Sequence, residues 1–295
     1  MSIHERTRKT KLFQGERSLI ITGLIGFIFA AICALSIYID QPVVLPEGNM
    51  KDAFAFNAAV GIFILSIAAI LPLSKFSTRK RKIVRWLFIV SSLYGYCIET
   101  IQHFRGINPR FSKVGGAIDI IAGMLFGIVS LILVVLILVL ATHFLRMKAA
   151  NHHRSMLIIG IRYAFLSAIA GNIAGLWMIV LQDRYIGEAG NFIVLHGISF
   201  HGLQALFLLA WLLEKIQPNQ VYKIRMLHLG CISWTLSLLC IANQTSIGRS
   251  SFELSLFPLL SVILLLFWLA TLIVTLKLFL QQYRFQMPRL TLRSR

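Results

Sequence analysis

Residues 192–213 read FIVLHGISFHGLQALFLLAWLL, an apolar run that contains no Asp, Glu, Lys or Arg. A helix of about 20 apolar residues is long enough to cross the hydrocarbon core of a bilayer. This run nevertheless contains His196, His201 and Gln204, and moving such polar groups out of water is costly. The stretch therefore predicts a membrane span whose polar side chains face something other than lipid.

The composition of the whole chain agrees with a membrane protein. Of its 295 residues, 57% are hydrophobic and 14% are charged, and the mean hydropathy is +0.78. A soluble chain of this length needs a larger share of polar surface. Span-length apolar windows recur, and we place about eight of them at roughly 19–39, 53–73, 86–104, 116–145, 155–181, 192–213, 228–246 and 256–280.

The predicted fold class is thus all-α, a polytopic transmembrane helix bundle. We expect a basic cytoplasmic N-terminal segment at 1–18, a single transmembrane helical domain at 19–280 and a basic cytoplasmic tail at 281–295. The loops are short, and no convincing internal repeat is evident, so a transporter built from inverted repeats is not indicated. All four cysteines fall within spans, which argues against a disulfide framework.

The net charge of +18 is distributed unevenly along the chain. With the N-terminus inside, 22 of the 29 basic residues lie in the inner segments. This asymmetry predicts that both termini are cytoplasmic, because positively charged loops stay on the cytoplasmic side during insertion. We expect the bilayer and its anionic headgroups to be partners of these basic segments, in the cytoplasmic (inner) membrane of a bacterium. Nucleic-acid binding has no separate support.

Polar residues also gather in the third span and the loop after it, GYCIETIQHFRGINPRFSKVGGAID at 95–119. Glu99 and His103 are four residues apart and share a helix face, and Gln102 is three residues from Glu99. Arg105 follows in the loop, and Asp119 begins the fourth span. In the predicted topology, all of these lie toward the outer side of the membrane.

The third, fourth and sixth spans therefore place polar groups at similar depth. We expect one site in the outer half of the bundle, in which His201 and Gln204 face Glu99. Positions at the water interface, or hydrogen bonds between helices, explain His103, His196 and Asp119 equally well. The candidate site residues are Glu99, Gln102, His103, Arg105, Asp119, His196, His201 and Gln204.

The run Glu99-x-x-Gln102-x-x-Arg105-Gly106, followed by Pro109-x-Phe111 and Asp119, resembles a pattern of uncharacterised bacterial polytopic membrane proteins. The later His201-Gly-Leu-Gln204 resembles a second pattern of the same group, and together they cover about 95–215. Arg110 stands where that group has a histidine before the phenylalanine. The resemblance implies that these residues form one site, and it implies no particular chemistry.

Three kinds of function stay open. The first is a small-solute or proton-coupled carrier, in which Glu99, Asp119 and the histidines titrate. The second is a redox or metal protein, or a membrane-embedded enzyme acting on a lipid or quinone. Haem b could lie between two of the imidazoles of His103, His196 and His201, or a divalent metal could bind Glu99, His103 and His201. The third is a structural or assembly protein whose polar residues hydrogen-bond between helices.

Overall fold

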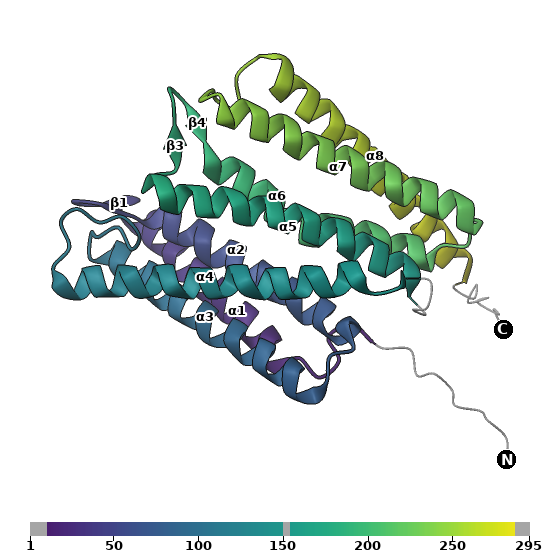
Figure 1. The fold of residues 1–295 in the computed structure, drawn as a ribbon, viewed down its shortest axis with the longest axis horizontal. Coiled ribbons are helices and arrows are strands. Elements are labelled where there is room, and N and C mark those ends of the chain that lie inside the picture. The colour runs from purple at the N-terminus through teal and green to yellow at the C-terminus, as the bar shows by residue number, and fades with distance from the viewer. Residues whose placement is uncertain (1–10, 150–153, 287–295) are drawn as a thin grey trace, which may run out of the picture. The chain divides into compact units, whose positions relative to one another are not determined.

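The computed structural model describes residues 11–149 and 154–286, which form long helices and two small hairpins (Figure 1). The all-α prediction is confirmed. In chain order the elements are α1 (Arg17–Ile39), β1 (Val43–Val44), β2 (Gly48–Asn49), α2 (Met50–Ile70), η1 (Leu71–Ser74), α3 (Thr78–Phe104), α4 (Ala117–Arg146), α5 (Ser155–Leu181), β3 (Tyr185–Ile186), β4 (Gly190–Asn191), α6 (Phe192–Lys215), α7 (Gln220–Ser246) and α8 (Leu256–Gln286).

Seven of the described helices are long and apolar enough to cross a membrane, and α3 falls outside this set. Helix α3 begins with the basic stretch TRKRK at 78–82 and carries Glu99 near its other end. Its apolar surface is therefore broken at both ends. The described residues form eight helices, of which α3 is the most polar, and the number of membrane spans stays a prediction.

The helices pack as two compact units. Unit 1 contains α1 to α4 and the last turns of α5, and unit 2 contains most of α5 together with α6 to α8. The sequence predicted one transmembrane domain and did not indicate this division.

In unit 1, small residues bring α1 close to its neighbours. A Cβ built on Gly61 of α2 would lie 3.0 Å from the carbonyl oxygen of Gly23 of α1. A Cβ built on Gly26 would lie 2.6 Å from the phenolic oxygen of Tyr96, which reaches across from α3. Small residues let helix backbones approach closely, which matters in a membrane because the hydrophobic effect does not drive helices together there.

In unit 2, a hydrogen-bonded pair of hydroxyl and indole groups connects three helices. Ser167 of α5 donates its hydroxyl to the carbonyl of Ser199 of α6 at 2.6 Å. The same hydroxyl accepts the indole N–H of Trp234 of α7 at 3.0 Å. These two hydrogen bonds therefore link α5, α6 and α7 in the interior of unit 2.

The two units share one order of elements: helix, hairpin, helix, helix, helix. Each hairpin ends in Gly-Asn, and the side chains of Asn49 and Asn191 cap the following helices by accepting a backbone N–H. Helices α3 and α7 each end before a glycine in the left-handed region, Gly106 at φ +75° and Gly248 at φ +77°. The carbonyls of both glycines accept N–H groups from the hairpin of the same unit.

The same number of residues separates the capping asparagine from this glycine in both units, so positions of α3 and α7 can be paired by counting back from Gly106 and Gly248. We call the end of each unit that holds the hairpin and this glycine the hairpin end. The duplication was not evident in the sequence because few paired positions carry the same side chain.

Candidate functional site

Glu99 is the centre of a charged cluster at the hairpin end of unit 1. Its side chain is fully buried, and its Oε1 accepts a hydrogen bond from the guanidinium of Arg110. The Arg110 guanidinium also lies over the rings of Phe56 and Phe126, with its carbon 5.4 and 5.8 Å from the ring centroids. An ion pair with aromatic neighbours stabilises both charges in a medium of low dielectric constant. Glu99 and Arg110 therefore form an ion pair whose cation lies against two aromatic rings.

His103 lies one turn along α3 from Glu99, with its Nε2 3.4 Å from Oε1. The backbone N–H of Asn49 donates to Nδ1 of His103 at 3.0 Å. Because Nδ1 accepts this hydrogen bond, it carries no proton, and the ring proton of the neutral imidazole is on Nε2. The hairpin thus fixes the tautomer of His103, whose Nε2 lies near Glu99 without a hydrogen bond to it.

Two atoms of this cluster are buried without a hydrogen-bond partner among the described residues, Oε2 of Glu99 and Nε2 of His103. The thiol of Cys33 of α1 also lies within electrostatic range of the Glu99 carboxylate. The carboxylate oxygen can take up a proton or accept a hydrogen bond from a ligand, and the Nε2–H of the imidazole can donate one.

Gln102, Arg105 and Asp119 form a second cluster beside the first. The amide nitrogen of Gln102 donates to Oδ1 of Asp119 at 3.0 Å, and Arg105 donates to the same oxygen at 2.5 Å. The backbone N–H of Gly116 donates to Oδ2 at 3.0 Å. This cluster joins the end of α3 to the start of α4 and closes the loop between them.

Unit 2 contains the same kind of cluster at the equivalent place. Gln244, which pairs with Gln102 in the count from the glycines, donates to Oε2 of Glu253 at 3.1 Å. Arg249 lies 3.6 Å from the other carboxylate oxygen of Glu253. Since both units make a glutamine–carboxylate–arginine contact here, we assign Gln102, Arg105 and Asp119 to loop closure.

The Glu99 cluster, in contrast, has no counterpart in unit 2. The residues that pair with Glu99 and His103 are Ile241 and Thr245, both buried in α7. Helix α7 therefore forms with an apolar side chain at the position that pairs with the carboxylate. Glu99, His103 and Arg110 are the residues that the fold itself does not require.

Glu47 of the unit 1 hairpin orders the loop that carries Arg110. Its carboxylate accepts the hydroxyl of Ser112 at 2.6 Å and the backbone N–H of Lys113 at 2.8 Å. The Ser112 hydroxyl is the main cause that lowers the pKa of Glu47 below its ordinary value of 4.5, and the N–H groups of Lys113 and Asn108 add to it. No sequence pattern singles out Glu47 or Asn49, because their contacts join segments 54 or more residues apart. Arg110 is only 11 residues from Glu99, but the fold of the loop that brings the two together is not visible in the sequence.

The remaining candidate residues belong to unit 2. A ring nitrogen of His196, Nδ1, lies 2.8 Å from the carbonyl oxygen of Gly171, and the ring contacts Phe200. Nδ1 of His201 is 3.3 Å from the side-chain oxygen of Gln204, and His201 is exposed. Their meeting with Glu99, which lies in unit 1, stays a prediction.

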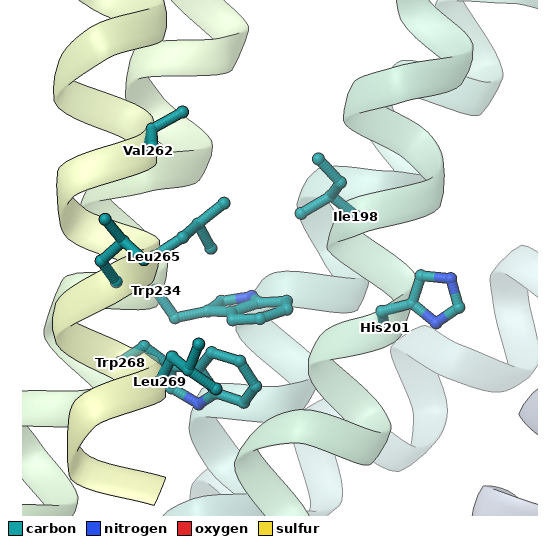
Figure 2. Close-up of a pocket in the computed structure, with 8 residues that line it drawn as sticks. Ile198, His201, Trp234, Val262, Leu265, Trp268 and Leu269 are labelled. Atoms are coloured by element: carbon teal, nitrogen blue, oxygen red, sulfur yellow. The ribbon is translucent and has the colours of Figure 1, made fainter. Parts of the chain in front are cut away.

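A pocket of about 330 Å³ lies between α6, α7 and α8, in unit 2 (Figure 2). The indole rings of Trp234 and Trp268 lie edge to face, with centroids 5.0 Å apart. Figure 2 shows the ring of His201 directed away from the two indoles. The residues that line the pocket are Ile198, His201, Trp234, Val262, Leu265, Leu266, Trp268 and Leu269. This pocket is apolar and is separate from the Glu99 cluster of unit 1.

Within the described parts of the chain, no three His, Cys, Asp or Glu residues come together in a group that could hold a metal ion. The suggested metal set of Glu99, His103 and His201 draws on both units and stays a hypothesis from the sequence. Ligation of haem b by histidines from the two units stays a hypothesis from the sequence.

Comparison with known proteins gives no family model, no curated protein and no solved structure that matches the chain.

Proposed function

We propose that this protein is an integral membrane carrier that binds a proton and a small anion together at the hairpin end of unit 1. Glu99 is the proton-binding group and Arg110 is the anion-binding group. The observation that supports this most directly is the buried Glu99 carboxylate, which has one oxygen on Arg110 and the other without a partner among the described residues.

Coupling requires that Arg110 pairs with either Glu99 or the anion. While Glu99 is charged, the guanidinium is engaged by its carboxylate. A proton on Glu99 removes that charge and releases Arg110, which is about 29% exposed, to pair with an anion from solution. Proton binding and anion binding then favour each other by the same free energy.

His103 would assist proton binding by the Glu99 carboxyl group. Its Nε2 lies 3.4 Å from Oε1, close enough for the N–H dipole to favour the carboxylate in the anion-free state. When Glu99 is protonated, the imidazole can keep its tautomer, because the Asn49 N–H still occupies Nδ1. His103 therefore orients the carboxyl group and need not change its own charge.

We place the hairpin end on the outer side of a bacterial cytoplasmic membrane. The basic segment at 75–85 lies at the opposite end of its helices from the hairpin, and so do Arg146, Lys148 and Arg154. Positive charge favours the cytoplasmic side. Anionic headgroups would bind these basic segments. The carrier then takes up its proton and anion from outside the cell.

The proposal is tested by measuring proton uptake on anion binding. Purified protein in weakly buffered detergent solution, with a pH-indicator dye, receives sulfate, chloride or acetate in separate titrations. We expect at least one anion to bind with uptake of about one proton per protein, because the two sites are linked. Absence of proton uptake with every anion would contradict the proposal.

Two variants and one control identify the groups. Glu99→Gln should still bind the anion but without proton uptake, because Arg110 is already released. Arg110→Gln should lose anion binding. Lys113→Gln removes a neighbouring exposed cation of the same loop and should behave like the wild type. If Lys113→Gln and Arg110→Gln weaken binding equally, the anion is held by general surface charge and Arg110 is not a specific site.

A further inference from the structure

Helix α3 carries a row of buried polar side chains that continues from the Glu99 cluster toward the middle of the helix. Ser92, Tyr96, Glu99 and His103 fall within an arc of about 60°, at about 100° per residue. All four are 2% exposed or less. We call these four residues the polar face of α3.

Each residue of the polar face has a buried polar atom without a hydrogen-bond partner among the described residues. These atoms are the hydroxyl oxygens of Ser92 and Tyr96, Oε2 of Glu99 and Nε2 of His103. Neighbours three or four residues apart on a helix are about 5 to 6 Å apart at Cβ. Buried polar groups in native proteins find partners, commonly ordered water, and a water needs two or more such groups nearby. The polar face provides two such groups within reach of a water molecule at each step along its length.

Unit 2 provides an internal comparison. Counted back from Gly106 and Gly248, the positions of the polar face correspond to Trp234, Leu238, Ile241 and Thr245 of α7. All four are buried, and three of them carry no hydroxyl or charged group. The fold of a unit therefore forms with an essentially apolar face at these positions, and the polar face of unit 1 needs a reason beyond folding.

The polar face ends at an apolar side chain. Phe88 is fully buried one turn before Ser92 on the same side of α3, and its ring lies edge-on to that of Phe63 at 5.9 Å. One turn further, Arg85 is paired with the fully buried Glu16, with Nε 2.6 Å from Oε2. Phe88 thus separates the polar face from a charged cluster at the opposite end of unit 1.

We propose that the polar face of α3 is a hydrated proton path from the Glu99–His103 pair to Ser92, and that Phe88 closes it toward the Arg85–Glu16 cluster. This inference rests on the proposed function, since Glu99 is the group that takes up the proton. Water molecules along the row carry the proton between Glu99 and the hydroxyls of Tyr96 and Ser92. Movement of Phe88 would then connect the two ends of unit 1.

The closure is tested by proton flux into proteoliposomes loaded with a pH-sensitive dye. Phe88→Ala should raise the proton permeability several-fold above that of the wild type, and adding Glu99→Gln should reduce the leak. Phe144→Ala is the control, because Phe144 is equally buried in α4 of the same unit but away from the polar face. Equal permeability of Phe88→Ala and Phe144→Ala would overturn the role of Phe88.

Thiol labelling tests the hydration of the polar face with a substitution that leaves no large cavity. In a background without the four native cysteines, Ser92→Cys should react with N-ethylmaleimide several-fold faster than Ser233→Cys, because the thiolate is the reactive form and needs a hydrated site. Ser233 is the matched control, a buried serine of α7 whose hydroxyl donates to the Leu229 carbonyl.

Equal labelling at the two positions would overturn the path. The proposed function would survive that result if Glu99→Gln still separates anion binding from proton uptake. The reverse outcome, rapid labelling at Ser92 without proton-coupled anion binding, would leave a hydrated path and reject the carrier.

Discussion

Replacing Asp119 by Asn tests whether the Gln102–Asp119–Arg105 cluster closes the loop or belongs to the proton site. Asp119 accepts hydrogen bonds from Gln102, Arg105 and the N–H of Gly116. Hydrogen bonds to a charged group contribute about 1.5 to 3 kcal/mol each, but Arg105 is 51% exposed and its share is reduced by solvent. The amide of Asn can still accept from some of these donors. We therefore expect Asp119→Asn to lower the free energy of unfolding by about 2 to 3 kcal/mol.

The equivalent change in unit 2 should be milder. Glu253 is 40% exposed, and its partner Arg249 is 61% exposed at 3.6 Å, so the hydrogen bond from Gln244 is the main loss. Glu253→Gln should cost about 1 kcal/mol. Thermal unfolding in detergent, followed by intrinsic tryptophan fluorescence, measures both variants. A loss of about 2 to 3 kcal/mol corresponds to roughly 5 °C in Tm for a chain of this size.

The decisive comparison is between stability and proton uptake. Asp119→Asn should be less stable but should keep the wild-type proton uptake per bound anion, because Glu99 and Arg110 are unchanged. A folded Asp119→Asn protein that binds the anion without proton uptake would refute the assignment to loop closure. Unchanged Tm in Asp119→Asn would refute the energetic reasoning.

Two further predictions concern the hairpin end. Because the pKa of Glu47 is lowered, its contribution to stability is present above 4.5 and is lost as the pH falls through the lowered pKa. The loop at 107–116 should therefore exchange its amide hydrogens faster as the pH falls below 4.5, after correction for intrinsic rates. Glu47→Gln should remove this pH dependence, and an unchanged profile would reject the role of Glu47. Reporter fusions after Gly106 and Gly248 should report the outside, whereas fusions after Lys82 and Asn219 should report the cytoplasm; reversed signals at either pair would invert the proposed direction of uptake.

The local sequence predicted much of the candidate site because its residues share one helix. Glu99, Gln102 and His103 are three or four residues apart, and this spacing places them on adjoining faces of α3 whatever the rest of the chain does. Asp119 also lies where expected, at the start of α4, and binds Gln102 and Arg105. The sequence could not separate the residues that close the loop from those that form the charged pair, since both sets are polar and close in the chain.

The sequence alone determined that this is a chain of apolar helices, because the free energy of moving side chains from water to lipid depends on composition and length. It could not determine which helices are partners. A helix that is apolar on every side has no face that identifies its neighbour, so shape and a few hydrogen bonds decide. Gly26 admits Tyr96, and Asn49 reaches His103 across 54 residues of chain. Only the tertiary structure showed these contacts and the duplicated units, and with them which polar residues the fold requires and which it does not.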